Sequence, residues 1–142
     1  MTDPVDLPLL TGGCLCGRVR YTARGAPTFE LNCHCRVCQK ITGSGYTPVA
    51  AFAEDAVRVE GEIKYHERLG DSGRKVWEGF CAECGARLTG KAETMPGLLL
   101  LQAGNYDDPN RFKPTADIFT ASAAHWDAMD PALAKFAGMP EM

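Results

Sequence analysis

The stretch Phe80-Cys81-Ala82-Glu83-Cys84-Gly85, in the middle of a chain of 142 residues, decides the fold. It has the form of a zinc knuckle, in which two thiolates lie one tight turn apart and the following glycine lets the backbone direct N–H groups at the sulfurs. A knuckle supplies two ligands, whereas a closed tetrahedral site needs four, so a second pair must come from elsewhere. Cys14-Leu15-Cys16-Gly17 is the natural candidate, because it too ends in glycine.

The sequence therefore predicts a structural zinc ion held by Cys14, Cys16, Cys81 and Cys84. Such a site would clamp the start of the chain to its middle and close a long loop. The competing interpretation is a redox CxxC pair at Cys81 and Cys84, with Cys14 and Cys16 as ordinary buried thiols. A redox CxxC is expected beside a βαβ unit, and the sequence shows no such unit, so metal binding is favoured.

The other three of the seven cysteines lie in Cys33-His34-Cys35-Arg36-Val37-Cys38, with no fourth cysteine left to complete a site. Three protein ligands leave a zinc ion one open position for water or a substrate thiolate, as in catalytic zinc sites. The spacing therefore predicts a second, catalytic zinc at Cys33, Cys35 and Cys38.

Three alternatives to that open site remain: a closed site completed by His66 or His125, a redox-active cysteine cluster, and three cysteines that only pack. His34 is a poor fourth ligand, because it sits between two proposed ligands and would project away from an ion that both of them face. We expect it to be a hydrogen-bonded polar neighbour of the site.

Length and cysteine usage fit one soluble domain of a reducing compartment. With 45% apolar residues, the chain is long enough for one core and too short for two, so residues 1–142 are expected to form a single domain. We expect a cytoplasmic protein, and in such a reducing compartment an odd number of cysteines favours metal binding over a disulfide framework.

Two further classes of partner are not expected. Residues 1–13 contain no Lys or Arg, so we expect no secretory signal. The longest apolar run, around residues 98–101, is far shorter than the ~20 residues of a membrane helix, so we expect no anchor and no membrane binding. A net charge of −3 without a basic run argues against nucleic-acid binding.

Eight short segments alternate polar and apolar positions or are rich in β-branched and aromatic residues, and Gly, Pro or Asp bound them. They cover residues 17–24, 28–32, 46–52, 56–59, 63–68, 75–80, 98–103 and 118–122. Two short helices are expected, one over about residues 39–42 and one beginning at Pro131, since proline is tolerated at the first helical position. The sequence predicts an all-β domain of short antiparallel strands with minor helices.

Taken together, the cysteine motifs at residues 13–17, 33–38 and 80–85 resemble the glutathione-dependent formaldehyde-activating enzyme family, also called the centromere-protein-V-like family. The resemblance spans about residues 12–140, including a C-terminal signature from Asp117-Ile118-Phe119 through Trp126-Asp127. Family members often carry histidine where this chain has Asp117. The resemblance implies a zinc-stabilised, β-tent-like fold with two zinc ions, a structural one on Cys14, Cys16, Cys81 and Cys84 and a catalytic one on Cys33, Cys35 and Cys38.

The resemblance also implies an activity, that of a carbon–sulfur lyase which joins a thiol such as glutathione to a small aldehyde such as formaldehyde. The alternatives are a zinc-stabilised binding module and a thiol or metal sensor without catalysis. The unfilled fourth position of the triplet favours an exchangeable ligand and hence the enzyme. We expect a monomer or a homodimer.

Overall fold

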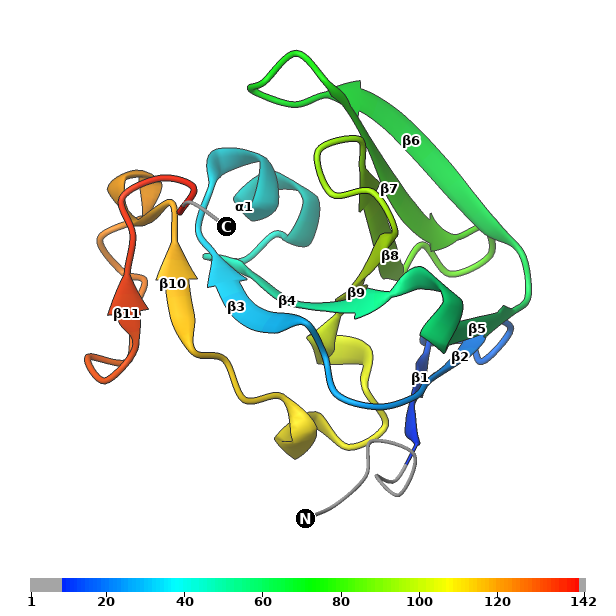
Figure 1. The fold of residues 1–142 in the computed structure, drawn as a ribbon. Helices are drawn as coiled ribbons and strands as arrows, with labels where there is room; N and C mark the ends of the chain where they lie inside the picture. Colours follow the sequence, from blue (N-terminus) through cyan, green and yellow to red (C-terminus); the bar gives the residue numbers. More distant parts are fainter. Residues whose placement is uncertain (1–8, 141–142) are drawn as a thin grey trace.

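The computed structural model describes residues 9–140, in which eleven strands form two sheets and one α-helix packs beside the larger sheet (Figure 1). The predicted all-β class is confirmed. The smaller sheet consists of β1 (Leu10–Gly13), β2 (Arg20–Ala23) and β5 (Val57–Glu60), and its strands pair antiparallel.

The larger sheet has eight strands. Their spatial order is β11 (Ala134–Lys135), β10 (Ala116–Ile118), β3 (Phe29–Cys33), β4 (Thr47–Ala53), β9 (Leu98–Gln102), β8 (Arg87–Ala92), β7 (Lys75–Cys81) and β6 (Ile63–Leu69). β10 runs parallel to both β3 and β11, whereas the other pairs are antiparallel as expected. The parallel pairing with β3 places β10 beside the strand that leads into the cysteine triplet.

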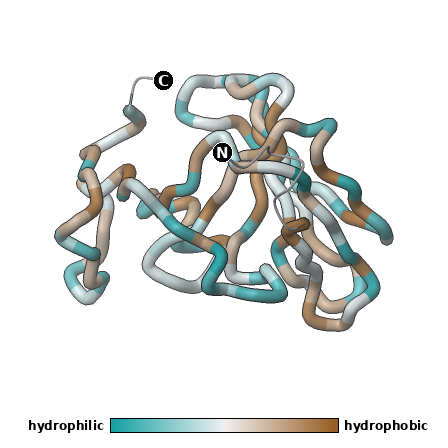
Figure 2. The backbone as a smooth tube through the Cα atoms, turned by 60° about the horizontal axis from the view of Figure 1, so that its bottom comes forward, coloured by the Kyte–Doolittle hydropathy of each residue, from teal (hydrophilic) through white to brown (hydrophobic). Residues whose placement is uncertain are grey.

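The main core lies between the two sheets and includes the two most buried cysteines. Tyr21 of the smaller sheet packs with Phe52 and Leu101 of the larger sheet, and Cys14 and Cys81 belong to the same cluster. Hydrophobic and hydrophilic residues alternate along much of the chain, as expected of strands with one buried face (Figure 2). One cysteine of each pair is therefore part of the packed interior, whereas Cys16 is exposed and Cys84 is partly buried.

The α-helix α1 (Arg36–Thr42) follows β3 and confirms the helix expected near residues 39–42. Its N-cap is Cys35, whose Sγ accepts a hydrogen bond from the Cys38 amide at 3.1 Å. It ends at Gly43, which adopts a left-handed conformation with φ of 69°. The remaining helical turns are short 3-10 segments: η2 (Glu54–Ala56), η3 (Ala103–Asn105), η4 (Pro109–Arg111) and η5 (Thr120–Ser122).

Three expectations about local structure are wrong in whole or in part. The helix expected from Pro131 is a turn followed by β11, because Ala134 and Phe136 donate backbone hydrogen bonds to Thr115 and Asp117 and extend the sheet. The strand expected at residues 118–122 stops at Ile118 and continues as η5. The strand expected from residue 17 begins only at Arg20, because the preceding residues form the loop of Cys14 and Cys16.

Strands β1 and β8 were not expected, and glycine accounts for both omissions. A Cβ on Gly12 would lie 2.5 Å from Tyr21 Cζ and 2.6 Å from the Asn105 carbonyl oxygen, so this part of β1 has room only for glycine. Gly90 lies inside β8 and lowers its apparent strand propensity, although a Cβ there would meet Leu100 only at an ordinary contact distance of 3.6 Å. Close packing, which a strand propensity does not register, therefore accounts for the glycine in β1 but not for the one in β8.

Within residues 9–140, no helix is long and apolar enough to cross a bilayer. The expectation that no signal or anchor is present rests on residues 1–13, and residues 1–8 lie outside the described part of the chain. The single domain over residues 1–142 stays a prediction.

Candidate metal centres

The structure brings together the four cysteines predicted to hold the structural ion. Cys14 and Cys16 lie on the loop between β1 and β2, and Cys81 and Cys84 lie at the turn between β7 and β8. Their four Sγ atoms all lie within 4.8 Å of one another, with 3.5 Å between Cys14 and Cys16 and 3.8 Å between Cys16 and Cys81. A tetrahedral zinc ion with bonds of about 2.3 Å separates its sulfurs by about 3.8 Å, so the group fits zinc.

Backbone amides face these sulfurs, as the motif predicts. The Val19 amide donates to Cys14 Sγ at 3.3 Å and the Cys84 amide to Cys81 Sγ at 3.5 Å. Gly17 and Gly85 have φ of 82° and 77°, a region that favours glycine, and each closes the tight turn of its pair. The amide dipoles stabilise thiolate, the form that binds metal.

The predicted catalytic cysteines also converge. The Sγ atoms of Cys33, at the end of β3, and of Cys35 and Cys38, at the start of α1, all lie within 4.8 Å of one another. No histidine or acidic side chain of residues 9–140 joins this group. His66 lies on β6 and His125 is exposed, so neither supplies the fourth ligand of a closed site.

The thiols of the triplet influence one another strongly. Hydrogen bonds from Cys33 and Cys38 lower the pKa of Cys35 to about 2, although burial opposes the shift. The contacts with Cys35 and Cys38, together with burial, raise the pKa of Cys33. One thiolate is therefore favoured within the triplet, and a metal ion would displace the protons of its neighbours. Three sulfurs and no fourth protein ligand fit a zinc ion with one open position.

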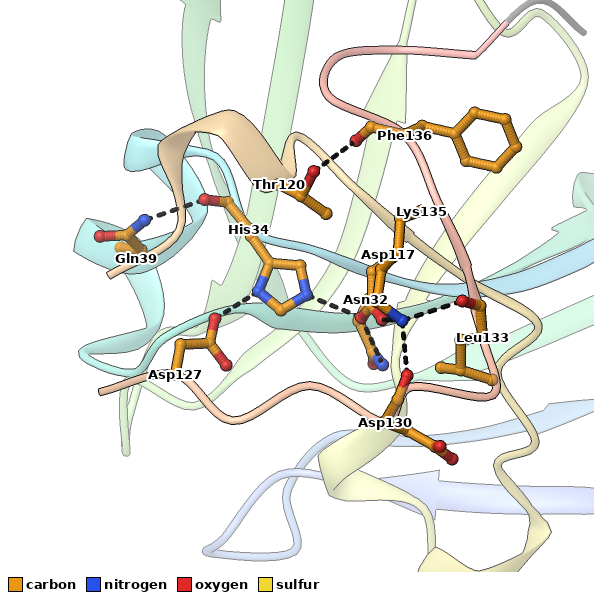
Figure 3. A network of polar contacts seen from close by, with 10 residues as sticks. All are labelled: Asn32, His34, Gln39, Asp117, Thr120, Asp127, Asp130, Leu133, Lys135 and Phe136. Carbon is orange, nitrogen blue, oxygen red and sulfur yellow. Dashed lines mark hydrogen bonds and ion pairs between the residues drawn. The ribbon is translucent and has the colours of Figure 1, made fainter. Parts of the chain in front are cut away.

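His34 does not belong to the group of three sulfurs, and its ring lies in a buried polar network (Figure 3). Its side chain is 1% exposed, and both ring nitrogens contact carboxylates: Nε2 lies 2.7 Å from Asp117 Oδ1, and Nδ1 contacts Asp127 Oδ2. Lys135 Nζ lies 3.0 Å from the other oxygen of Asp117. The expectation that His34 is a hydrogen-bonded neighbour and no ligand agrees with this geometry.

The pKa of Asp117 is lowered in spite of its burial. Burial alone would raise the pKa of Asp117, but hydrogen bonds from His34, Lys135 and Asn32 outweigh it and hold the pKa below its ordinary value. Sequence reasoning noted Asp117 only as a departure from the family pattern and missed the roles of Asp127 and Lys135. A carboxylate in a short apolar strand was the one available signal, since such a group needs a partner when buried.

A pocket of about 440 Å³ lies between the segments that carry the two cysteine groups. Thr42 and Tyr46 line one side, and the Thr42 hydroxyl donates to the Cys38 carbonyl at 2.7 Å. Gly85, next to Cys84, and Arg87 line the other side. Arg87 is the one charged residue of the lining, and it was not among the residues predicted for the site.

Together, the fold and these sites define a class: an all-β domain with one group of four cysteines and one of three, each arranged for a metal ion. The chain belongs to the glutathione-dependent formaldehyde-activating enzyme family, whose model matches residues 9–122. The predicted family is thus confirmed. No curated protein matches the chain.

One solved structure with a similar fold is the crystal structure of a Rhodobacter sphaeroides protein that was a structural-genomics target. The two chains share 17% sequence identity and superpose with a TM-score of 0.56, over 71% of this chain and 93% of the other. At this identity the likeness concerns the fold alone.

Proposed function

We propose that this protein is a zinc-dependent carbon–sulfur lyase that joins a thiol such as glutathione to a small aldehyde such as formaldehyde. Membership of the family supports the reaction class. The observation that carries the proposal is the convergence of Cys33, Cys35 and Cys38 without a fourth protein ligand among residues 9–140. All seven cysteines are free thiols, which suits a reducing compartment such as the cytoplasm.

In this proposal Cys14, Cys16, Cys81 and Cys84 hold a structural zinc, and Cys33, Cys35 and Cys38 hold a catalytic one. When bound at the triplet, zinc supplies an open position for a thiolate or an aldehyde oxygen. The reaction forms one carbon–sulfur bond, and the proton lost from the thiol ends on the new hydroxyl group. Its atoms and electrons balance without an oxidant or a reductant.

The protein contributes mainly by holding the two reactants together. Three thiolates around a dipositive ion leave a net charge of −1, so the site is a weaker Lewis acid than one built from neutral histidines. Thiols also add to formaldehyde without a catalyst. Correct placement of two reactants can lower a barrier by up to about 7–11 kcal/mol, and this is the larger contribution available here.

The pocket, whose lining begins at Ile41, three residues after Cys38 in the chain, offers a place for the body of the thiol substrate. Arg87 and Arg68 both bond to Glu78, so two guanidinium groups share one carboxylate and leave one positive charge in excess. Arg87 Nε is buried and has no hydrogen-bond partner. A carboxylate of a thiol such as glutathione would balance this charge from the pocket.

We expect Arg87→Gln to raise the KM for glutathione about tenfold and to leave the zinc content unchanged, because one charge-assisted hydrogen bond contributes about 1.5–3 kcal/mol. Arg68→Gln is the matched control, since it removes the other cation from Glu78 but does not line the pocket. Steady-state kinetics of both variants measure the effect. Equal changes in KM for the two variants would show that Arg87 acts through Glu78 and not on the substrate.

The proposed reaction itself is tested by formaldehyde consumption with glutathione, measured against the uncatalysed background. The rate should exceed the background in proportion to enzyme concentration, and removal of zinc by a chelator should abolish the excess. A rate equal to the background at high enzyme concentration would rule out this activity. It would favour a zinc-stabilised binding module or a sensor instead.

A further inference from the structure

The C-terminal part of the chain encloses the side chain of His34. Asp117 lies on β10, which pairs in parallel with β3 and places Ile118 opposite Cys33. Directly after β10, Phe119 has φ of 56°, the one positive φ at a residue other than glycine in the described part of the chain. This turn leads through η5 to Asp127, which contacts the second ring nitrogen (Figure 3). Two carboxylates of the same C-terminal segment thus contact the two ring nitrogens of one imidazole.

The backbone around His34 is held by the same segment. The His34 amide donates to the Ile118 carbonyl at 3.0 Å. Gln39 Nε2 donates to both the His34 carbonyl and the Ser122 carbonyl, each at 2.9 Å, and so ties α1 to η5. Residue 34 is therefore fixed at its amide, its carbonyl and both nitrogens of its ring.

The backbone strain at Phe119 and the burial of two carboxylates are both unfavourable, which indicates that this arrangement serves a function. A non-glycine residue in the left-handed region is strained and persists only where its surroundings impose that conformation. Two carboxylates with side chains 1% and 3% exposed add a desolvation cost, which His34 and Lys135 offset. The family match ends at residue 122, so Asp127 and Lys135 lie beyond it.

We propose that Asp117 and Asp127 are positioning residues which, by fixing His34, set the directions of the Cys33 and Cys35 side chains on either side of it and so preform the three-sulfur site. The inference rests on the proposed metal at the triplet and does not depend on the identity of the substrate. A loop of this kind gains metal affinity when its ligands are held in place before the ion binds.

The test counts the metal ions on each chain by native mass spectrometry during titration with a zinc chelator. The Cys35→Ser variant, which keeps only the four-cysteine group, identifies which ion leaves first. We expect Asp127→Ala to weaken the triplet ion about tenfold, in line with the effect of altering groups that orient ligands. Asp127→Asn should restore the affinity to within about threefold, because an amide of the same shape can donate to or accept from the ring in either tautomer.

Thr120→Val is the matched control. It removes a hydrogen bond between two parts of the C-terminal segment, the Thr120 hydroxyl to the Phe136 carbonyl, without touching His34, and should leave both ions unaffected. Lys135→Met removes the cation beside Asp117 at a partly exposed position and should weaken the triplet ion in the same direction, which keeps the test decisive if Asp127→Ala does not fold.

An unchanged triplet affinity in Asp127→Ala, or in Lys135→Met if the former is unfolded, would overturn the inference. Equal weakening of both ions with a matching loss of stability would also overturn it, because it would show a general structural role. A wild-type chain that holds no second ion would overturn the proposed function together with this inference. Two ions in wild type with unchanged variants would overturn the inference alone.

Discussion

Replacing Cys81 with serine is expected to unfold most of the domain at room temperature. Cys81 ends β7, is 1% exposed and belongs both to the main core and to the four-sulfur group. Binding of a structural zinc is worth about 10–16 kcal/mol in small zinc domains, whereas the net stability of a domain is about 5–15 kcal/mol. Loss of this ion therefore removes a stabilisation that is comparable to the net stability of the whole domain.

The measurement is circular dichroism with chemical denaturation, alongside native mass spectrometry of the same sample. Cys35→Ser is the control, since it makes the same chemical change in the other cysteine group. We expect the control to keep a cooperative unfolding transition. If Cys81→Ser unfolded at the same denaturant concentration as wild type, the four-cysteine group would not stabilise the fold.

Cys35→Ser is expected to lower kcat/KM at least a hundredfold while the fold is kept. Cys35 is the N-cap of α1, and serine is a favoured N-cap residue, so the helix can still begin at residue 36. The substitution removes the sulfur that its two neighbours most strongly favour as thiolate. Serine is a poor ligand for zinc at neutral pH, and two remaining thiolates would hold the ion weakly.

Steady-state kinetics above the uncatalysed rate, with zinc analysis of the same preparation, measure this effect. The expected result is one zinc per chain and a rate close to the background. A variant that lost its zinc at the triplet but kept the rate would show that the reaction does not use this site. A variant that lost its fold would show that the triplet is structural.

The cysteine groups could be predicted because their information is local and chemical. The spacing of Cys81 and Cys84, followed by Gly85, defines a turn. Zinc takes four ligands, so a count of the seven cysteines shows that the group of Cys33, Cys35 and Cys38 lacks a fourth thiol. The structure brings together the same two groups. Most strands could be predicted for the same reason, since alternation along the chain reports one buried face.

The end of the chain could not be predicted in this way. Residues after Pro131 have a composition that suits a helix, yet they form β11 because the edge of β10 offers unpaired backbone groups. The turn at Phe119 has no sequence signal, since bulky residues seldom adopt a positive φ. The carboxylates around His34 were missed because their partners lie more than 80 residues away in the chain.

The pocket lies beyond sequence reasoning for a related reason. Arg87 meets Thr42 and Tyr46 only because β8 and the end of α1 face one another in the folded domain. Glu78 pairs with both Arg68 and Arg87, which lie on the two strands that neighbour its own strand in the sheet. This pairing, which forms only in the folded sheet, determines which of the two cations faces the pocket.

The division of the seven cysteines into a group of four and a group of three is tested most directly by the metal content of the protein purified without chelator. Elemental analysis combined with native mass spectrometry should give two zinc ions per wild-type chain and one per Cys35→Ser chain. A reproducible value of one zinc per wild-type chain would contradict the second site and the catalytic role assigned to Cys33, Cys35 and Cys38.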